Sequence, residues 1–284
     1  ISGKSLDCSI IIDEMLKNGS KSSVFDNINN FNSIVKLNID KIYIDKVYYL
    51  NFINGNIKFL KNNIVNLNLE ANFLDNKRFT FTIKTNENSE KITTLFSEYA
   101  KPLVKKYKFI KGFEDGFLDF YSIKKNNKSK SKLNIYDFKL NELPVLTKIL
   151  TLASLQGIAD LLTGEGIRFN EFEMNFNNKN KLMTIDEIYA IGPAISILME
   201  GYIEEDKLVS LRGTLVPATT LNKAIGSIPL LGDILVGKKV GEGVFGVSFK
   251  IKGPPKDLKT TVNPIKTLTP RFITRTLEKI KKIN

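Results

Sequence analysis

Apolar and polar residues alternate over long stretches of the first third of the sequence, and this pattern limits the folds that the chain can adopt. From Val65 to Phe73 every second residue is apolar, and the residues between them are three asparagines and a glutamate. The same period recurs between Ile34 and Lys84. A two-residue period places apolar side chains on one face of a strand and polar side chains on the other, as in antiparallel meanders. The chain is therefore predicted to be mainly β.

Turn-forming residues predict where these strands reverse. Asp75-Asn-Lys77 is expected to close a hairpin, and Gly55 within Asn-Gly-Asn indicates a second one. The lysine-rich run 124–132 indicates a polar turn, either a solvated loop tip or a phosphate-binding patch. Residues 88–107 are expected to form a helix between strands, which Pro102 kinks or ends.

A second, more apolar helix is predicted to begin at Pro144, which suits a first helical turn, and to close at Gly164 and Gly166. A helix that is apolar nearly all round is normally buried in a core, and the alternative is a lid over an apolar groove. Its candidates for apolar contact, together with those of a later segment, are Leu150, Leu155, Ile158, Leu162, Ile228, Leu230, Leu231 and Ile234.

Strand character continues through the second half of the chain. The segments expected to form strands are 133–140, 167–176, 181–190, 194–203, 208–217 and 244–251. Between the last two lies an almost uncharged segment, 221–237, which Gly226, Pro229 and Gly232 divide into short apolar helical pieces. This arrangement joins two strands, each apolar on one side, through apolar helices. It suggests that some of the apolar surface has a function in addition to forming a core.

The positive charge of the chain is concentrated at its end. The formal net charge is +12, and ten lysines and arginines stand against two acids between Lys250 and Asn284. Residues 269–283 are predicted to form a basic amphipathic helix, either lying in an anionic membrane interface or docked on its own domain. Its membrane-contact candidates are Arg271, Phe272, Ile273, Arg275, Leu277, Lys279, Ile280, Lys281 and Lys282.

Several kinds of chemistry have no residues to support them. Histidine is absent and Cys8 is the single cysteine, so neither a Ser-His-Asp triad nor a Cys-His pair nor a cysteine zinc cluster can be assembled. The glycines at 241–246 are not followed by a predicted helix, which argues against a phosphate loop. We therefore expect a protein that is not an enzyme, with no catalytic residue, metal or cofactor.

Several short motifs occur in a fixed order along the second half. They are Pro144-Val-Leu-Thr-Lys-Ile-Leu-Thr-Leu-Ala-Ser-Leu-Gln-Gly-Ile-Ala-Asp-Leu-Leu-Thr-Gly-Glu-Gly-Ile167, Leu211-Arg-Gly-Thr-Leu-Val-Pro217, Asn222, Ile228-Pro-Leu-Leu-Gly232, Val262-Asn-Pro264 and Leu268-Thr-Pro270. Together they resemble the C-terminal region of the AsmA-like envelope proteins of the YhdP type, relatives of TamB, over roughly residues 33–275. The motif residues expected to have structural roles are Gly213, Pro217, Asn222, Pro229, Gly232, Asn263, Pro264 and Pro270.

The resemblance implies a bridge-like protein that carries phospholipid between inner and outer membranes. It implies a periplasmic location and an inner-membrane anchor upstream of Ile1, which this chain lacks along with most of the groove repeats. The sequence also departs from many relatives at Thr269-Pro-Arg271, where they carry a glycine after the proline. The implied architecture is a long antiparallel meander curled into an open hydrophobic groove, with apolar and amphipathic helices packed at the C-terminal end.

Two continuous parts and three functions are considered from the sequence. Residues 1–132 are expected to supply groove strands, and residues 133–284 the AsmA-like C-terminal region with its helices. The leading hypothesis is a non-enzymatic lipid-transfer module whose partners are phospholipid acyl chains and an anionic membrane surface. The alternatives are an envelope scaffold or assembly factor for outer-membrane proteins, with an unknown protein partner, and a basic nucleic-acid-binding protein. Nucleic acid is not expected, because the aromatic residues mostly fall on the apolar phase of the strands.

Overall fold

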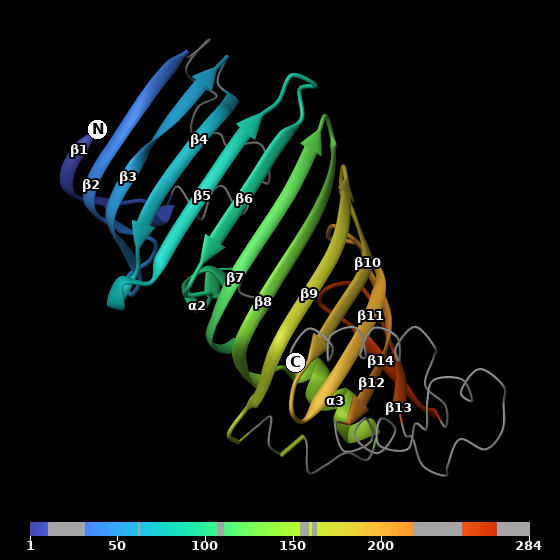
Figure 1. Cartoon of the computed structure of the whole chain (residues 1–284). Helices are drawn as coiled ribbons and strands as arrows, with labels where there is room; N and C mark the ends of the chain where they lie inside the picture. The colour runs from blue at the N-terminus through green and yellow to red at the C-terminus, as the bar shows by residue number, and fades with distance from the viewer. Residues whose placement is uncertain are drawn as a thin grey trace, which may run out of the picture.

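The computed structural model describes residues 1–10, 32–61, 63–106, 111–153, 159–160, 164–217 and 246–265. These residues form one open sheet of 14 strands, which lie side by side in the order in which they occur in the sequence (Figure 1). All neighbouring pairs are antiparallel except β1 and β2, which are parallel. The chain is therefore mainly β, as its alternation predicts.

The strands are β1 (Ser2–Asp7), β2 (Ser33–Tyr43), β3 (Tyr49–Leu60), β4 (Asn63–Asn72), β5 (Arg78–Thr85), β6 (Lys91–Ser97), β7 (Lys111–Lys125), β8 (Lys128–Glu142), β9 (Ile167–Lys179), β10 (Leu182–Ile191), β11 (Ile195–Glu204), β12 (Leu208–Pro217), β13 (Gly246–Gly253) and β14 (Lys259–Ile265). The helical elements are the 3-10 turn η1 (Leu74–Asn76) and the α-helices α2 (Lys101–Lys106) and α3 (Pro144–Leu152). The expected junction between residues 132 and 133 falls inside β8, so the sheet runs across it without a break.

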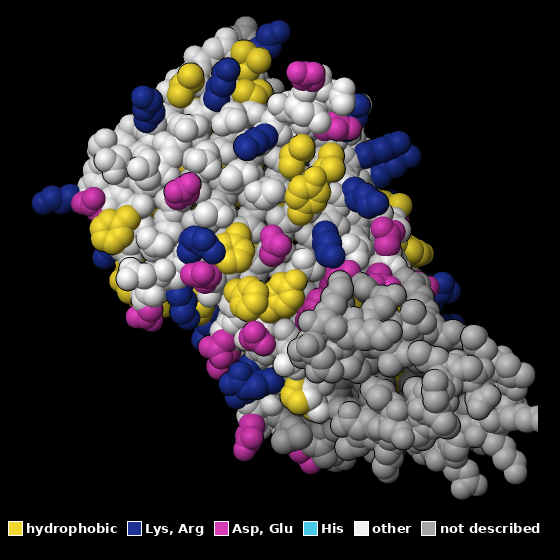
Figure 2. Space-filling model, viewed as in Figure 1, with side chains coloured by type: hydrophobic (Ala, Val, Ile, Leu, Met, Phe, Trp, Pro, Cys, Tyr) yellow, Lys and Arg dark blue, Asp and Glu magenta, His cyan; other side chains and the backbone are white. Residues whose placement is uncertain are grey.

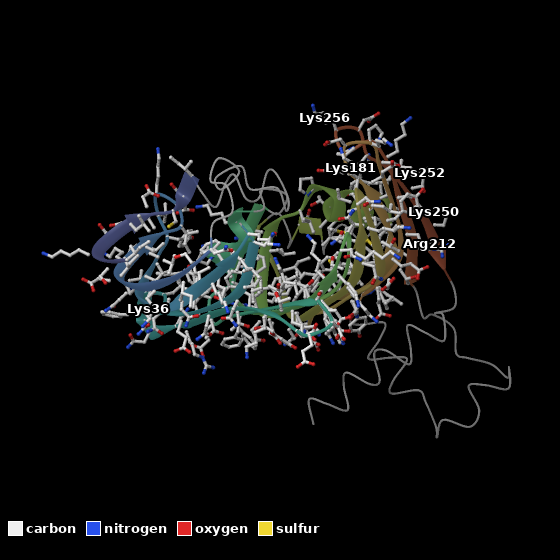
Figure 3. The ribbon with its side chains drawn as sticks, turned by 90° about the horizontal axis from the view of Figure 1, so that it is seen from above. Lys36, Lys181, Arg212, Lys250, Lys252 and Lys256 are labelled. Carbon is white, nitrogen blue, oxygen red and sulfur yellow. The ribbon has the colours of Figure 1, made fainter. Side chains whose placement is uncertain are left out.

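The two faces of the sheet differ in polarity, as a period of two requires. Along β2, exposed residues such as Lys36 alternate with less exposed ones such as Leu37 and Ile39. We call the face that carries Leu37 the inner face and the opposite face the outer face. The sheet is curved, and α2 and α3 lie within the curve, while Lys36 lies on the convex side (Figure 3).

Two clusters of buried side chains hold the fold together, both on the inner side. The larger one joins residues of α2 and α3, such as Val104 and Leu150, to strands from β7 to β13. The smaller one lies between β3, β4 and β5 and includes Ile53, Phe73 and Phe79. The helices therefore cover part of the inner face at one end of the strands.

The helix predicted at 88–107 is wrong over most of its length. Residues 91–97 form strand β6, and of the described residues in this range only Lys101–Lys106 are helical. Ile92, Thr93 and Thr94 are β-branched, which favours a strand over a helix. Thr94 hydrogen-bonds through its hydroxyl to that of Thr82 on β5, at 2.6 Å. Pro102 lies in the first turn of α2, where a proline is tolerated, and so does not end the helix.

One expected turn is wrong, and another is shorter than expected. Gly55 lies in the middle of β3, and a Cβ there would come within 2.0 Å of the Asn68 carbonyl oxygen. Gly55 therefore allows β3 and β4 to lie close together, and it does not form a hairpin turn. In the lysine-rich run only Asn126 and Asn127 form a turn, and the lysines on either side belong to β7 and β8. Alternation of lysine with serine in β8 is itself a strand pattern.

Other local predictions are confirmed. The reversal at 75–77 is present, with Asp75 and Asn76 at positive φ, which Asp and Asn tolerate better than most residues. Pro144 occupies the first turn of α3. Strand β14 is not predicted from the sequence, and Pro264 lies in it; a proline suits an edge strand because it cannot donate to a ladder.

Candidate functional site

One row of residues crosses the inner face from β2 to β14, and each member lies directly opposite the next in the strand register. The row is almost entirely apolar, and only two glycines interrupt its side chains. In order it is Leu37, Gly55, Leu69, Phe81, Leu95, Phe120, Leu133, Met174, Ile188, Met199, Gly213, Phe249 and Val262. We call these residues the central row. It gives the sheet a continuous apolar path at right angles to the strands.

Most of the central row is only half-buried. Ile188 and Phe249 are buried, and the remaining side chains of the row keep part of their surface exposed. Five of the partly exposed members pack against the larger core cluster: Leu95, Phe120, Leu133, Met199 and Val262. Contiguous apolar surface that stays exposed marks a binding surface more often than scattered exposed residues do. The row is therefore the feature of this fold that most resembles a site.

The second glycine of the row is fixed by packing. A Cβ at Gly213 would come within 2.5 Å of the Leu198 carbonyl oxygen and 2.6 Å of the Phe249 ring. Phe249 thus occupies the space that a side chain at Gly213 would need. This is the physical reason for a glycine at one of the motif positions identified in the sequence.

The helices cover the inner face near one end of the strands. Leu146, Ile149 and Leu150 of α3 are buried, and Leu150 has no exposed surface. Ala100, just before α2, and Val104 within it pack into the same cluster as the strands from β7 onward. Among the strands, α2 lies mainly against β7 and α3 mainly against β14.

The inner face becomes polar toward the other end of the same strands. One step along from the central row, Thr93, Ser122 and Ser131 lie opposite one another on β6, β7 and β8. Ser122 and Ser131 are buried, and their hydroxyl oxygens are 2.8 Å apart in a hydrogen bond. One step further, Lys91 lies directly opposite Lys124. The face therefore grades from apolar through hydroxyl to cationic within five residues of β6.

The two lysines form a like-charge pair across neighbouring strands. Like charges directly opposite one another destabilise a sheet. Burial, and then the positive charge of Lys124, lower the pKa of Lys91. Glu90 precedes Lys91 and Lys125 follows Lys124 in the sequence, and these two neighbours form an ion pair at 3.8 Å. Alternation assigns both of them to the outer face.

The outer face carries charges of both signs. Figure 2 shows lysine and arginine side chains interspersed with acidic ones on the visible face. Arg212 donates to Glu200 from two guanidinium nitrogens, at 2.9 and 2.6 Å. Figure 3 labels Arg212 with Lys250 and Lys252 of the neighbouring strand. The described part of the chain thus shows paired surface charges here, which contribute little to stability individually.

Some basic side chains lie over aromatic rings. The ammonium of Lys41 is 4.2 Å from the ring centroid of Tyr49, and that of Lys77 is 4.6 Å from the ring of Tyr99. Burial and interactions with Tyr48 raise the pKa of Tyr99 to about 12. Each of these contacts provides a modest local stabilisation.

Two shallow depressions occur in the described structure. The first, about 540 Å³, lies beside α3. Its lining residues are Asn141, Leu143, Pro144, Thr147, Lys148, Thr151 and Leu152. The second, about 600 Å³, lies across β10 to β13, and its lining residues are Ile185, Asp186, Glu200, Gly201, Tyr202, Ser210, Leu211, Arg212, Lys250, Ile251 and Lys252. Neither depression includes a residue that the sequence singles out as an apolar contact.

The structure describes only some of the residues predicted from the sequence. Leu150 is in the core, Gly213 and Pro217 lie on β12, and Asn263 and Pro264 lie on β14. The following lie outside the described residues: Leu155, Ile158, Leu162, Asn222, Ile228, Pro229, Leu230, Leu231, Gly232, Ile234, Pro270 and the helix candidates from Arg271 to Lys282.

The sequence does not predict that Lys91 and Lys124 face the same way. Lys91 falls in the segment predicted as a helix, and Lys124 in the run predicted as a turn. The alternation Lys91-Ile-Thr-Thr-Leu-Phe-Ser97 contains the signal, since it puts Lys91 in phase with Leu95. Their juxtaposition, however, depends on a register that the sequence does not specify.

Two further observations concern the described residues only. They contain no group of three or more cysteines and acids placed to hold a metal ion. None of their helices is long and apolar enough to cross a membrane. No family model, curated protein or solved structure matches the chain.

Proposed function

We propose that this chain is a non-enzymatic lipid-transfer module, in which the inner face of the sheet is a hydrophobic groove for phospholipid acyl chains. The observation that carries the proposal is the central row. It runs from β2 to β14 without a polar side chain, and its apolar side chains are partly exposed except those of Ile188 and Phe249, which are buried. Strands about 4.8 Å apart give this path a length of roughly 58 Å over its twelve steps.

The chemistry of the row suits acyl chains better than most other ligands. Burial of an acyl chain contributes about 0.8 kcal/mol per methylene and needs no polar partner. A chain that moves from one strand to the next along the row exchanges one apolar contact for another. The lack of a polar barrier between neighbouring strands is what sliding, as opposed to static binding, requires.

The wider assignment follows from the motifs in the second half of the sequence. Under this proposal the chain is the C-terminal part of an AsmA-like bridge protein, located in the periplasm and anchored in the inner membrane by an upstream segment. The apolar and basic helices predicted near the C-terminus would contact an anionic membrane surface. The helices α2 and α3 would close one end of the groove.

Lipid analysis of the purified chain tests the proposal. After gentle purification, native mass spectrometry and thin-layer chromatography should detect phospholipid bound to the wild-type protein. Leu37→Glu places a charge on the central row, and it should lower the bound lipid several-fold. Ile34→Glu is the matched control on the same strand, because Ile34 lies on the outer face and is 62% exposed.

The other outcomes decide between the proposed function and its alternatives. Phospholipid that is absent from the wild-type protein, or equally reduced in both variants, contradicts the groove. Crosslinking that traps nascent outer-membrane proteins would favour an assembly factor, whose binding element would be the edge strand β14. Tight and steeply salt-dependent retention of DNA or RNA would favour a nucleic-acid-binding protein.

A further inference from the structure

We infer that Lys91 and Lys124 form a site for the phosphate group of an anionic amphiphile whose acyl chains lie on the central row. The inference rests on the proposed function and adds to it the class of headgroup and its position. The two lysines lie directly opposite one another on β6 and β7, at the polar end of the inner face.

The first argument is electrostatic. The neighbours of the lysine pair on the inner face are neutral: Thr85 opposite Lys91, and Ser129 opposite Lys124. Two ammonium groups on directly opposed residues repel each other, and the repulsion is stronger where the groups are half-buried. An anion between them would remove this repulsion. Lysine ammonium groups are common phosphate ligands, acting as point charges.

The second argument is the order of chemistry along the strands. Next to the lysine pair lie the partly exposed hydroxyl of Thr93 and the buried, mutually hydrogen-bonded hydroxyls of Ser122 and Ser131, and beyond them lies the central row at Leu95 and Phe120. The four residue steps from Lys91 to Leu95 span about 13 Å of strand. A phospholipid presents complementary groups in the same order. These are an anionic phosphate, the esters of the glycerol backbone, which accept hydrogen bonds, and the first methylenes of the acyl chains.

The third argument separates this pair from the other lysines at the same end of the sheet. Lys84 on β5 and Lys130 on β8 lie opposite Ile92 and Ile123, on the outer face. Both are exposed, and alternation puts them across the sheet from the apolar path. Neither of them can contact a headgroup whose chains lie on the inner face. They are suitable controls because they carry the same charge and lie at almost the same position along the strands.

The test compares three probes on the full-length chain. The probes are a short-chain phosphatidylglycerol, a diacylglycerol with the same chains, and inorganic phosphate. The site variant is Lys91→Gln/Lys124→Gln, and the control is Lys84→Gln/Lys130→Gln. We expect the site variant to weaken phosphatidylglycerol binding at least tenfold and to leave diacylglycerol binding unchanged. The control should bind both lipids as the wild type does.

Each failure of the test has a separate meaning. Wild-type affinity for phosphatidylglycerol in the site variant overturns the headgroup site and leaves the groove standing. Binding of inorganic phosphate as tightly as phosphatidylglycerol overturns it in favour of a simple anion site. A wild-type protein that binds neither lipid contradicts both the groove and the site. Circular dichroism of each variant verifies that the sheet is intact.

Discussion

Gly213 on β12 lies directly opposite Phe249 on β13, and the ring of Phe249 covers the position where a side chain at Gly213 would begin. Replacing Gly213 by alanine should therefore force a shift of the ring or of β11, since the Leu198 carbonyl is equally close. We expect Gly213→Ala to lower the free energy of unfolding by about 1–3 kcal/mol, as overpacking typically does. Gly3→Ala is the control, because nothing lies within 4 Å of a Cβ there. Equal urea midpoints for the two variants would contradict this packing.

The packing of α3 against the sheet can be tested with two leucines of this helix. Leu150 is fully buried against the sheet, whereas Leu152 is 52% exposed. Leu150→Ala should cost about 2–5 kcal/mol of unfolding free energy, from lost burial and the cavity that remains. Leu152→Ala should change it by less than about 0.5 kcal/mol. Urea unfolding of both variants measures the difference, and a large effect at Leu152 would argue against this placement of the helix.

The buried hydroxyl pair makes a prediction of non-additivity. Ser122→Ala leaves the hydroxyl of Ser131 buried without its partner, which costs about 1–3 kcal/mol. Ser131→Ala should do the same to Ser122. The double variant removes both groups, so its loss of stability should be smaller than the sum of the two single losses. Strict additivity in a double-mutant cycle would show that the two hydroxyls do not interact.

Much of the fold follows from local pattern, and the reasons are visible in particular residues. Val65 to Phe73 gives β4 because its alternation specifies one apolar face. Pro144 gives the start of α3 because its fixed φ suits a first turn. β6 is missed because Leu95 and Phe96 have helical spacing with Ile92, although the β-branched residues Thr93 and Thr94 between them favour a strand.

The candidate site depends on information that no local pattern holds. The central row exists only because thirteen strands pair in one register, and the bulge at Asp186 on β10 keeps the apolar phase aligned where alternation alone would lose it. Gly55 has the local sequence of a hairpin, yet the approach of β4 makes it a row member in mid-strand. The sequence therefore predicts an apolar face but not its continuity.

The repulsion between the two inner lysines predicts a pH-dependent stability. The pKa of Lys91 is lowered by burial and by Lys124, so the folded state holds this proton less tightly than the unfolded chain does. The unfavourable charge is fully present at neutral pH and is lost as pH rises toward the ordinary lysine pKa of about 10.4. Lys91→Met should therefore stabilise the protein at pH 7, and the gain should shrink by about pH 11. Urea midpoints of both proteins across this range measure it, and a gain that is absent or independent of pH would contradict the assignment.

The account depends most on acyl chains lying along the central row. A photoreactive group placed at Phe120, on the row, and in a second protein at Tyr121, on the outer face of the same strand, compares the two faces directly. Illumination in the presence of phospholipid, followed by mass spectrometry, measures the lipid attached at each position. The account predicts attachment to acyl carbons from position 120 and little from position 121. Equal attachment from both positions, or none from position 120, would contradict it.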